Sequence, residues 1–286
     1  MNYPASGYAP VVLTIAGFDP GGGAGTAADL KTFAAHNCYG VAAITAMTIQ
    51  NTQGASAVYP VEASRLKECL ESLQADGNLR AVKIGMLASS ANAKVVADFL
   101  DANASLPSVL DPLLRSSSGL DLLDAGGLEF LRDHLLRRVS LVTPNLDEAG
   151  ALAGLKVESL EGMKTATRKL VEMGARAVVV TGGHLDKAID VFFDGTAIET
   201  FSGDRIKPDH THGTGCTFSS AIASNLALGR NVRDSVMLAK AYVAEAIRKA
   251  YATGPGRMPL NHFFRFQQHP RGADYAPAVA ETEPVR

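Results

Sequence analysis

The sequence predicts one α/β domain built around a mostly parallel sheet. Two observations lead to this fold class. Short runs of aliphatic and β-branched residues alternate with longer amphipathic segments along the chain, which is typical of βαβ units. The runs are also continuously apolar, as expected for strands that helices cover on both faces. The 286 residues contain neither an internal repeat nor a linker, so we interpret them as a single domain.

In chain order, the parallel strands are predicted at residues 11–16, 41–48, 81–84, 108–110, 140–143 and 177–180. Amphipathic helices are predicted between them, where apolar residues recur at helical spacing, as at Leu66, Cys69, Leu70 and Leu73 or at Met163, Ala166, Leu170 and Met173. Residues 189–201 predict a hairpin with an Asp194-Gly195 turn. Two long helices follow at 214–228 and 232–251, and the final residues, rich in Pro, Gly and Arg, predict a peripheral tail.

Composition excludes several classes of protein. Lys and Arg number 27 and Asp and Glu 29, so the formal net charge of −2 gives no electrostatic basis for binding nucleic acid or an anionic membrane. No 18 apolar residues run together, and no basic residue precedes Lys31, so we expect neither a membrane span nor a signal peptide. The cysteines Cys38, Cys69 and Cys216 lack C-x-x-C spacing, which argues against a disulfide framework or a structural zinc site. The sequence therefore predicts a cytoplasmic enzyme.

Cysteines and histidines that lie outside any motif receive a structural interpretation. Cys38 and Cys69 are expected in core or half-core positions. His36, His134 and His210 have no metal-ligand spacing and are expected at the surface.

In open α/β sheets, ligands bind beyond the carboxyl ends of the strands. The segments directly after the predicted strands are therefore the places to look for a site. They comprise residues 17–25, 50–52, 85–87, 111–112, 143–145 and 181–184.

Residues 17–25 form a glycine-rich segment between a predicted strand and a predicted helix. Gly23 begins a G-x-G-x-x-A sequence, but the chain has no Asp or Glu between Asp29 and Glu62 for the ribose of a dinucleotide. A P-loop sequence is also absent. Because glycines remove the side chains that would block a close approach, this segment predicts a loop whose backbone lies near a small ligand. The alternative is a tight turn, which needs fewer glycines.

Residues 212–216, His-Gly-Thr-Gly-Cys, precede a helix of small residues. The free backbone N–H groups at such a helix start bind anions and stabilise the charge on a transferring phosphoryl group. Cys216 lies in the first turn, where the helix dipole favours the thiolate. The alternative is a buried cysteine that packs the start of the helix.

These segments together resemble one branch of the ribokinase-like kinases, the hydroxymethylpyrimidine and phosphomethylpyrimidine kinases of thiamine biosynthesis. The resemblance covers roughly residues 11–265. It is carried by residues 16–25, 28–31, 44–52, 83–87, 111–112, 143–149, 181–184, 212–216 and 261–263. It implies a three-layer α/β/α fold, with residues 1–10 as an N-terminal extension, 11–265 as a single kinase domain and 266–286 as a C-terminal tail. It also implies ATP as co-substrate, Mg²⁺ as cofactor and a homo-oligomer, most simply a dimer.

The resemblance assigns roles to individual residues. Gly17 and Asp29 would lie at the substrate pocket, Gln50 would pair with the aminopyrimidine edge, and Met86 would pack on the ring. The catalytic loop would consist of Gly213, Thr214, Gly215 and Cys216, with Cys216 near the attacking hydroxymethyl oxygen. The ATP-binding residues would be Asp111, Asn145, Thr181 and Gly183, and Glu148 would hold magnesium through water. Asn145 and Glu148 also have the spacing of a helix capping box, and the two roles can coexist.

Three residues depart from the family pattern. Phe18 stands where a small Ser is usual, so its ring either narrows the pocket or turns away from it. Thr181 stands where several relatives have a Lys that would reach the ATP phosphates. Arg115 is also less typical of the family, and it is a candidate to supply that charge.

The resemblance implies phosphorylation of 4-amino-5-hydroxymethyl-2-methylpyrimidine and then of its monophosphate. One carboxamide at Gln50 can satisfy both the ring nitrogen and the amino group of this pyrimidine. The alternative for Gln50 is a turn residue bonded only to the backbone. Two other functions remain open, a pyridoxal or pyridoxine kinase of the same superfamily and a non-catalytic protein that binds the pyrimidine.

Overall fold

The structure, a computed structural model, describes residues 8–116, 118–183, 188–203, 206 and 211–266. Nine strands form one sheet in the order β3-β2-β1-β4-β5-β6-β7-β8-β9. Neighbours from β2 through β7 are parallel, whereas β3, β8 and β9 are antiparallel to their neighbours. The strands are β1 (Val11–Phe18), β2 (Tyr39–Asn51), β3 (Gly54–Pro60), β4 (Leu79–Ile84), β5 (Ser108–Leu110), β6 (Leu141–Val142), β7 (Val178–Gly182), β8 (Ala188–Phe193) and β9 (Ile198–Gly203).

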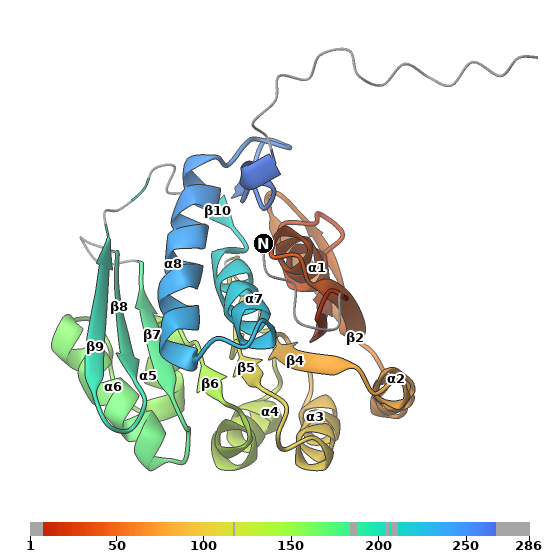
Figure 1. Cartoon of the computed structure of the whole chain (residues 1–286), viewed down its shortest axis with the longest axis horizontal. Helices are drawn as coiled ribbons and strands as arrows, with labels where there is room; N and C mark the ends of the chain where they lie inside the picture. The colour runs from red at the N-terminus through yellow and green to blue at the C-terminus, as the bar shows by residue number, and fades with distance from the viewer. Residues whose placement is uncertain (1–7, 117, 184–187, 204–205, 207–210, 267–286) are drawn as a thin grey trace, which may run out of the picture.

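Helices cover both faces of the sheet and make three layers (Figure 1). One face carries α1 (Gly25–Ala35), α7 (Thr214–Ala227) and α8 (Val232–Arg248), whose apolar residues form one core cluster with β-strand residues such as Val12 and Val179. The opposite face has its own cluster, built on strand residues such as Leu13 and Val180. Its helices are α2 (Ala63–Ala75), α3 (Ser90–Ala102), α4 (Ala125–Phe130), α5 (Leu146–Ala153) and α6 (Leu160–Glu172). The predicted α/β fold with a mostly parallel sheet is confirmed.

Successive strand residues face opposite layers, which explains why the runs are continuously apolar. Val12 packs in one cluster and Leu13 in the other, and both are fully buried. The six predicted strands and the predicted hairpin at 189–201 coincide with β1, β2 and β4 to β9. Strand β3 was not predicted; half-exposed and exposed residues such as Ser56 and Tyr59 give it no apolar run.

Helix ends follow local capping chemistry. Ser89, Asp124, Ser159 and Asn231 each accept a hydrogen bond at their side chain from a backbone N–H in the first turn of α3, α4, α6 and α8. A short π-helical turn at 131–135 and 3₁₀ turns at 136–138 and 264–266 complete the helical elements of the described residues.

The histidine predictions are partly wrong. His134 is exposed as expected, but His36 is buried. The His36 Nδ1 lies 2.8 Å from the carbonyl oxygen of Thr32, and its ring packs against Tyr242 with 4.5 Å between centroids. Burial lowers the pKa of His36 to about 4, so its neutral ring acts as a core side chain. His210 lies outside the described residues.

Cys38 is buried and Cys69 half-buried, as predicted. Within the described segments, no helix combines the length and the apolar character needed to cross a bilayer. The expected domain boundary at residue 265 stays a prediction, and most of residues 1–10 and 266–286 lie outside the described residues.

Candidate active site

One large cavity, of about 1500 Å³, lies at the carboxyl ends of the parallel strands. Every residue predicted for the site lines this cavity except Asp29. The predicted residues among those that line it are Gly17, Gln50, Met86, Asp111, Asn145, Glu148, Thr181, Gly183, Gly213, Thr214, Gly215 and Cys216. The rule for open α/β sheets therefore located the cavity from the strand positions that the sequence predicted.

The glycine-rich segment after β1 is organised around Asp19. The Asp19 carboxylate accepts hydrogen bonds from the backbone N–H groups of Gly21 at 2.8 Å, Gly23 at 3.1 Å and Ala24 at 2.9 Å. Burial alone would raise the pKa of Asp19, but hydrogen bonds from His212 and from the loop backbone hold it below its usual value. These N–H groups are thus hydrogen-bonded to a side chain of the protein itself and not directed at a ligand. The loop forms part of the cavity wall.

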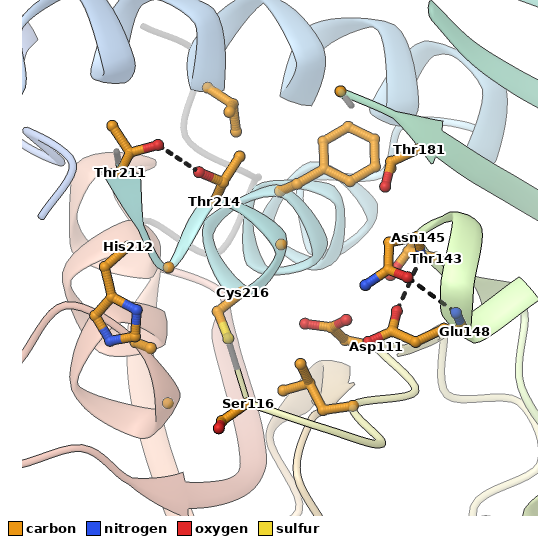
Figure 2. A pocket seen from close by; sticks show the side chains of 18 of the residues that line it. Asp111, Ser116, Thr143, Asn145, Glu148, Thr181, Thr211, His212, Thr214 and Cys216 are labelled. Carbon is orange, nitrogen blue, oxygen red and sulfur yellow. Dashed lines mark hydrogen bonds between the residues drawn. The ribbon is translucent and has the colours of Figure 1, made fainter. Parts of the chain in front are cut away.

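The Gly213–Cys216 segment begins α7 and packs directly on that loop. Gly213 has a φ of +85°, and a Cβ at this position would lie 1.7 Å from the carbonyl oxygen of Gly23. Only glycine fits there. The Thr211 and Thr214 hydroxyl oxygens are 3.2 Å apart at the entrance to the helix (Figure 2).

Cys216 departs from the expectation that the helix start favours its thiolate. The side chain is buried, and burial raises the pKa of Cys216 to about 12, although the nearby Lys83 ammonium lowers it. The free-energy cost of burying the thiolate outweighs the stabilisation that the helix terminus gives it, so the thiol is neutral at neutral pH. The negative charge of the nearby Asp111 raises the pKa of the thiol further. Figure 2 shows Asp111, Asn145 and Glu148 grouped on one side of the Cys216 side chain, with His212 on the other.

Asn145 and Glu148 form the predicted capping box. The Asn145 side-chain oxygen accepts from the Glu148 N–H, and the Glu148 carboxylate accepts from the Asn145 N–H, both at 2.9 Å. Burial raises the pKa of Glu148 to about 8, and the negative charge of Asp111 adds to this rise. Both effects favour the protonated form of Glu148. Burial likewise raises the pKa of Asp111 to about 6, although Lys83 opposes the shift. Two desolvated acidic groups at one cavity wall suit a bound cation, which would relieve their repulsion.

Asp29 requires a correction, because the structure places it beneath the cavity and not on its wall. Its carboxylate is fully buried and accepts from Thr14 Oγ1 at 2.6 Å, Ser220 Oγ at 2.7 Å and Lys83 Nζ at 2.9 Å. Both side chains of the Lys83–Asp29 ion pair are 0% exposed. Asp29 therefore joins β1, β4 and α7 in the floor of the site, and we no longer expect it to touch substrate.

Lys83 and His212 are residues of the site region to which the sequence analysis gave no role. A lysine in the middle of an apolar strand run was the available signal for Lys83, because such a charge is buried only with a partner. His212 immediately precedes the Gly213–Cys216 segment, and this position was the corresponding signal.

Gln50 is not the turn residue of the alternative interpretation. It lies in β2, lines the cavity, and its Nε2 is 2.7 Å from His212 Nε2. Met86 also lines the cavity and packs against Gly17, where a Cβ would lie 3.0 Å from its sulfur.

The three departures from the family pattern all lie at the cavity as well. Phe18 and Thr181 both line it, and the Thr181 side chain carries no positive charge. The Arg115 Nε donates to Asp121 at 2.8 Å in an exposed ion pair at the cavity rim.

Comparison with known proteins shows the family to which the chain belongs. Residues 19–261 match the phosphomethylpyrimidine kinase family. The chain is 41% identical over 248 residues to the hydroxymethylpyrimidine/phosphomethylpyrimidine kinase of Aquifex aeolicus, covering 86% of this chain and 97% of the relative. The pyridoxal kinase of Staphylococcus aureus in complex with ADP is 34% identical with a TM-score of 0.84, covering 92% and 96% of the two chains.

A phosphomethylpyrimidine kinase structure from Clostridium difficile 630 is 37% identical with a TM-score of 0.74, covering 83% of this chain and 99% of that one. The fold is therefore the ribokinase-like one, and both the sequence similarity and the structural similarity extend over most of the chain. This chain belongs to the phosphomethylpyrimidine kinase family.

Proposed function

We propose that this protein is the kinase that transfers a phosphoryl group from ATP to 4-amino-5-hydroxymethyl-2-methylpyrimidine and then to its monophosphate, in thiamine biosynthesis. Family membership and the shared cavity support this function. The single observation that carries it is that Gln50 and Met86, suited to a flat aminopyrimidine, line the same cavity as the Gly213–Cys216 helix start, suited to a phosphoryl group.

Phosphoryl transfer depends mainly on positioning and on stabilising charge. Gln50 and Met86 hold the ring so that its hydroxymethyl group faces the start of α7. The backbone N–H groups from Gly213 to Cys216 then stabilise negative charge on the group in transfer. Because the substrate hydroxyl loses its proton late in a loose transition state, a neutral Cys216 thiol can still orient that hydroxyl through its sulfur.

Magnesium is part of the proposal, and the residues present fit it. Glu148, aided by Asn145, would hold the ion through water on the acidic wall that also contains Asp111. Bound there, magnesium would neutralise charge on the ATP phosphates. Asp111, Asn145, Thr181 and Gly183 are proposed as the wall that contacts ATP.

A pyridoxal kinase activity is the second candidate. Its support is the structural similarity to pyridoxal kinases, such as that of Bacillus subtilis in an ADP complex at 31% identity and a TM-score of 0.82, covering 90% of this chain and 99% of that one. Gln50 favours the pyrimidine, because pyridoxal lacks the amino group that would pair with the carboxamide.

A coupled ADP-release assay with ATP and Mg²⁺ tests the proposal. It compares hydroxymethylpyrimidine, its monophosphate and pyridoxal as substrates. We expect the highest kcat/KM with the two pyrimidines. Turnover of pyridoxal alone would establish the second candidate, and pyrimidine binding without ADP release would indicate a non-catalytic binding protein.

We also propose that the enzyme acts in the cytoplasm as a homodimer. The support for the dimer is an apolar surface on the β2–β3 hairpin, where Met47, Ile49 and Tyr59 are 45%, 55% and 60% exposed. Met47 and Tyr59 are paired across the hairpin. Light scattering should give a dimer for the native chain and a monomer for Ile49→Lys.

A further inference from the structure

His212 connects the two glycine segments to the residue proposed to read the pyrimidine. Its Nε2 lies 2.7 Å from Gln50 Nε2 and 3.1 Å from Asp19 Oδ2. All three side chains line the cavity. One imidazole nitrogen thus stands between a carboxamide and a carboxylate.

A single imidazole nitrogen either donates or accepts a hydrogen bond, and it cannot do both. The Asp19 carboxylate offers only acceptors, and its Oδ2 already accepts from two loop N–H groups. His212 Nε2 must therefore carry a proton and donate to Asp19. The Gln50 atom 2.7 Å from the same nitrogen must then be an acceptor. Because the amide oxygen and nitrogen of a glutamine are assigned from the hydrogen-bond network, we assign the oxygen to that position and the NH₂ group to the position facing away from His212. The Asp19 and Gln50 oxygens then share the one N–H.

The imidazole of His212 is itself held in place by packing. A Cβ on Gly23 would lie 2.6 Å from His212 Cδ2, so the ring rests directly on the loop that Asp19 organises. The His212 side chain is 18% exposed, and that of Asp19 is 4% exposed. The Nε2–H of His212, the donor that faces Gln50, is consequently held in one position in the cavity wall.

We propose that His212 fixes the orientation of the Gln50 carboxamide and thereby makes the site select a 4-aminopyrimidine over the 4-oxo analogue of the same ring. This inference rests on the proposed function, in which Gln50 reads the pyrimidine. The aminopyrimidine edge has a ring-nitrogen acceptor beside an amino donor. The 4-oxo edge has a carbonyl acceptor beside a ring N–H donor, so donor and acceptor are exchanged.

A glutamine that turns freely could read both edges equally well, because rotation of its amide exchanges donor and acceptor. The substrate cannot turn over to compensate, since its hydroxymethyl group must face the Gly213–Cys216 loop. An amide held by His212 therefore leaves the 4-oxo ring with two mismatched polar groups. Selectivity comes from this penalty against the wrong ligand as much as from attraction for the right one.

The test measures the ratio of kcat/KM for the 4-amino and 4-oxo hydroxymethylpyrimidines. His212→Phe keeps a ring on the Gly23 loop but removes the donor, and His212→Gln provides a side chain that can satisfy either amide orientation. Both variants should lower the ratio about tenfold to a hundredfold, the value of one bidentate pair. Thermal melting and ATP affinity report that each variant is folded.

His262→Phe is the matched control, because His262 is a buried histidine whose Nε2 lies 3.1 Å from the Thr217 hydroxyl. It should change stability and leave the ratio unchanged. In a Gln50→Leu background, His212→Phe should no longer alter the ratio, a result that a purely structural role would not produce.

An unchanged ratio in both folded His212 variants would overturn the inference while leaving the proposed function intact. If the native enzyme neither binds nor phosphorylates the aminopyrimidine, the proposed function fails, and the inference fails with it.

Discussion

The buried ion pair between Lys83 and Asp29 makes a prediction about stability that can be worked through from the structure. Lys83→Met removes the ammonium while leaving the Asp29 carboxylate among Thr14 and Ser220, with no access to water. Breaking a buried pair by removing one partner costs about 3–5 kcal/mol, because the remaining charge is uncompensated. At roughly 2–4 °C per kcal/mol for a large domain, the melting temperature should fall by about 6–20 °C.

The double variant Asp29→Asn, Lys83→Met should recover most of that loss. The carboxamide that replaces the Asp29 carboxylate can still bond the Thr14 and Ser220 hydroxyls, and no charge remains to be buried. The exposed pair Arg65–Glu68 supplies the control, since its side chains are 67% and 62% exposed. Arg65→Met should leave the melting temperature unchanged.

Calorimetry at pH 7 with the three variants and the native chain measures these effects. Burial opposes the charge on Lys83, but Asp29 and its other acidic neighbours raise the pKa of Lys83 above its ordinary value. The stabilisation is therefore fully present below a pH of about 10.4 and is lost only at higher pH. A double variant as unstable as Lys83→Met, or less stable, would refute the idea that the two charges stabilise each other.

Three further predictions concern the cavity wall. Gln50→Leu should lower kcat/KM for the aminopyrimidine about tenfold to a hundredfold in steady-state assays, since each unpaired polar group costs roughly 1–3 kcal/mol, and should affect pyridoxal much less; equal losses would show that Gln50 supports the loop only. Cys216→Ala should lower kcat strongly and leave substrate affinity within a few-fold, and near-normal kcat would assign catalysis to the backbone N–H groups. Because burial raises the pKa of Glu148 to about 8, its stabilising contribution is present at low pH and lost as the pH rises through 8. In urea denaturation, the free energy of unfolding of Glu148→Gln should therefore rise relative to that of the native chain between about pH 5 and 9. Mg²⁺ should reduce this difference in stability. A difference that does not depend on pH would contradict the raised pKa of Glu148.

The sequence by itself determined the class of fold and the edge of the sheet at which the site lies. Strand runs such as 11–16 and 177–180 are readable because a strand buried on both faces needs an apolar residue at each position. The capping box of α5 is equally local, since Asn145 and Glu148 are three residues apart. Neighbours along the chain supply all of the information in these cases.

Strand β3 shows where local information ends. Its half-exposed residues carry no pattern, and its place in the sheet is set by pairing with β2, for example Met47 with Tyr59. His36 was misassigned for a similar reason, because its burial depends on Tyr242, which lies on α8 more than 200 residues away.

Only the tertiary structure decided how the site residues act on one another. Gln50 and His212 are 162 residues apart in sequence. Their side chains are nevertheless in contact, because the end of β2 and the start of α7 lie at the same cavity. The same holds for Asp29, which the folded chain turns inward to meet Lys83. Burial then reversed the expectation for Cys216, since desolvation of a thiolate depends on every layer packed around it and not on the helix start alone.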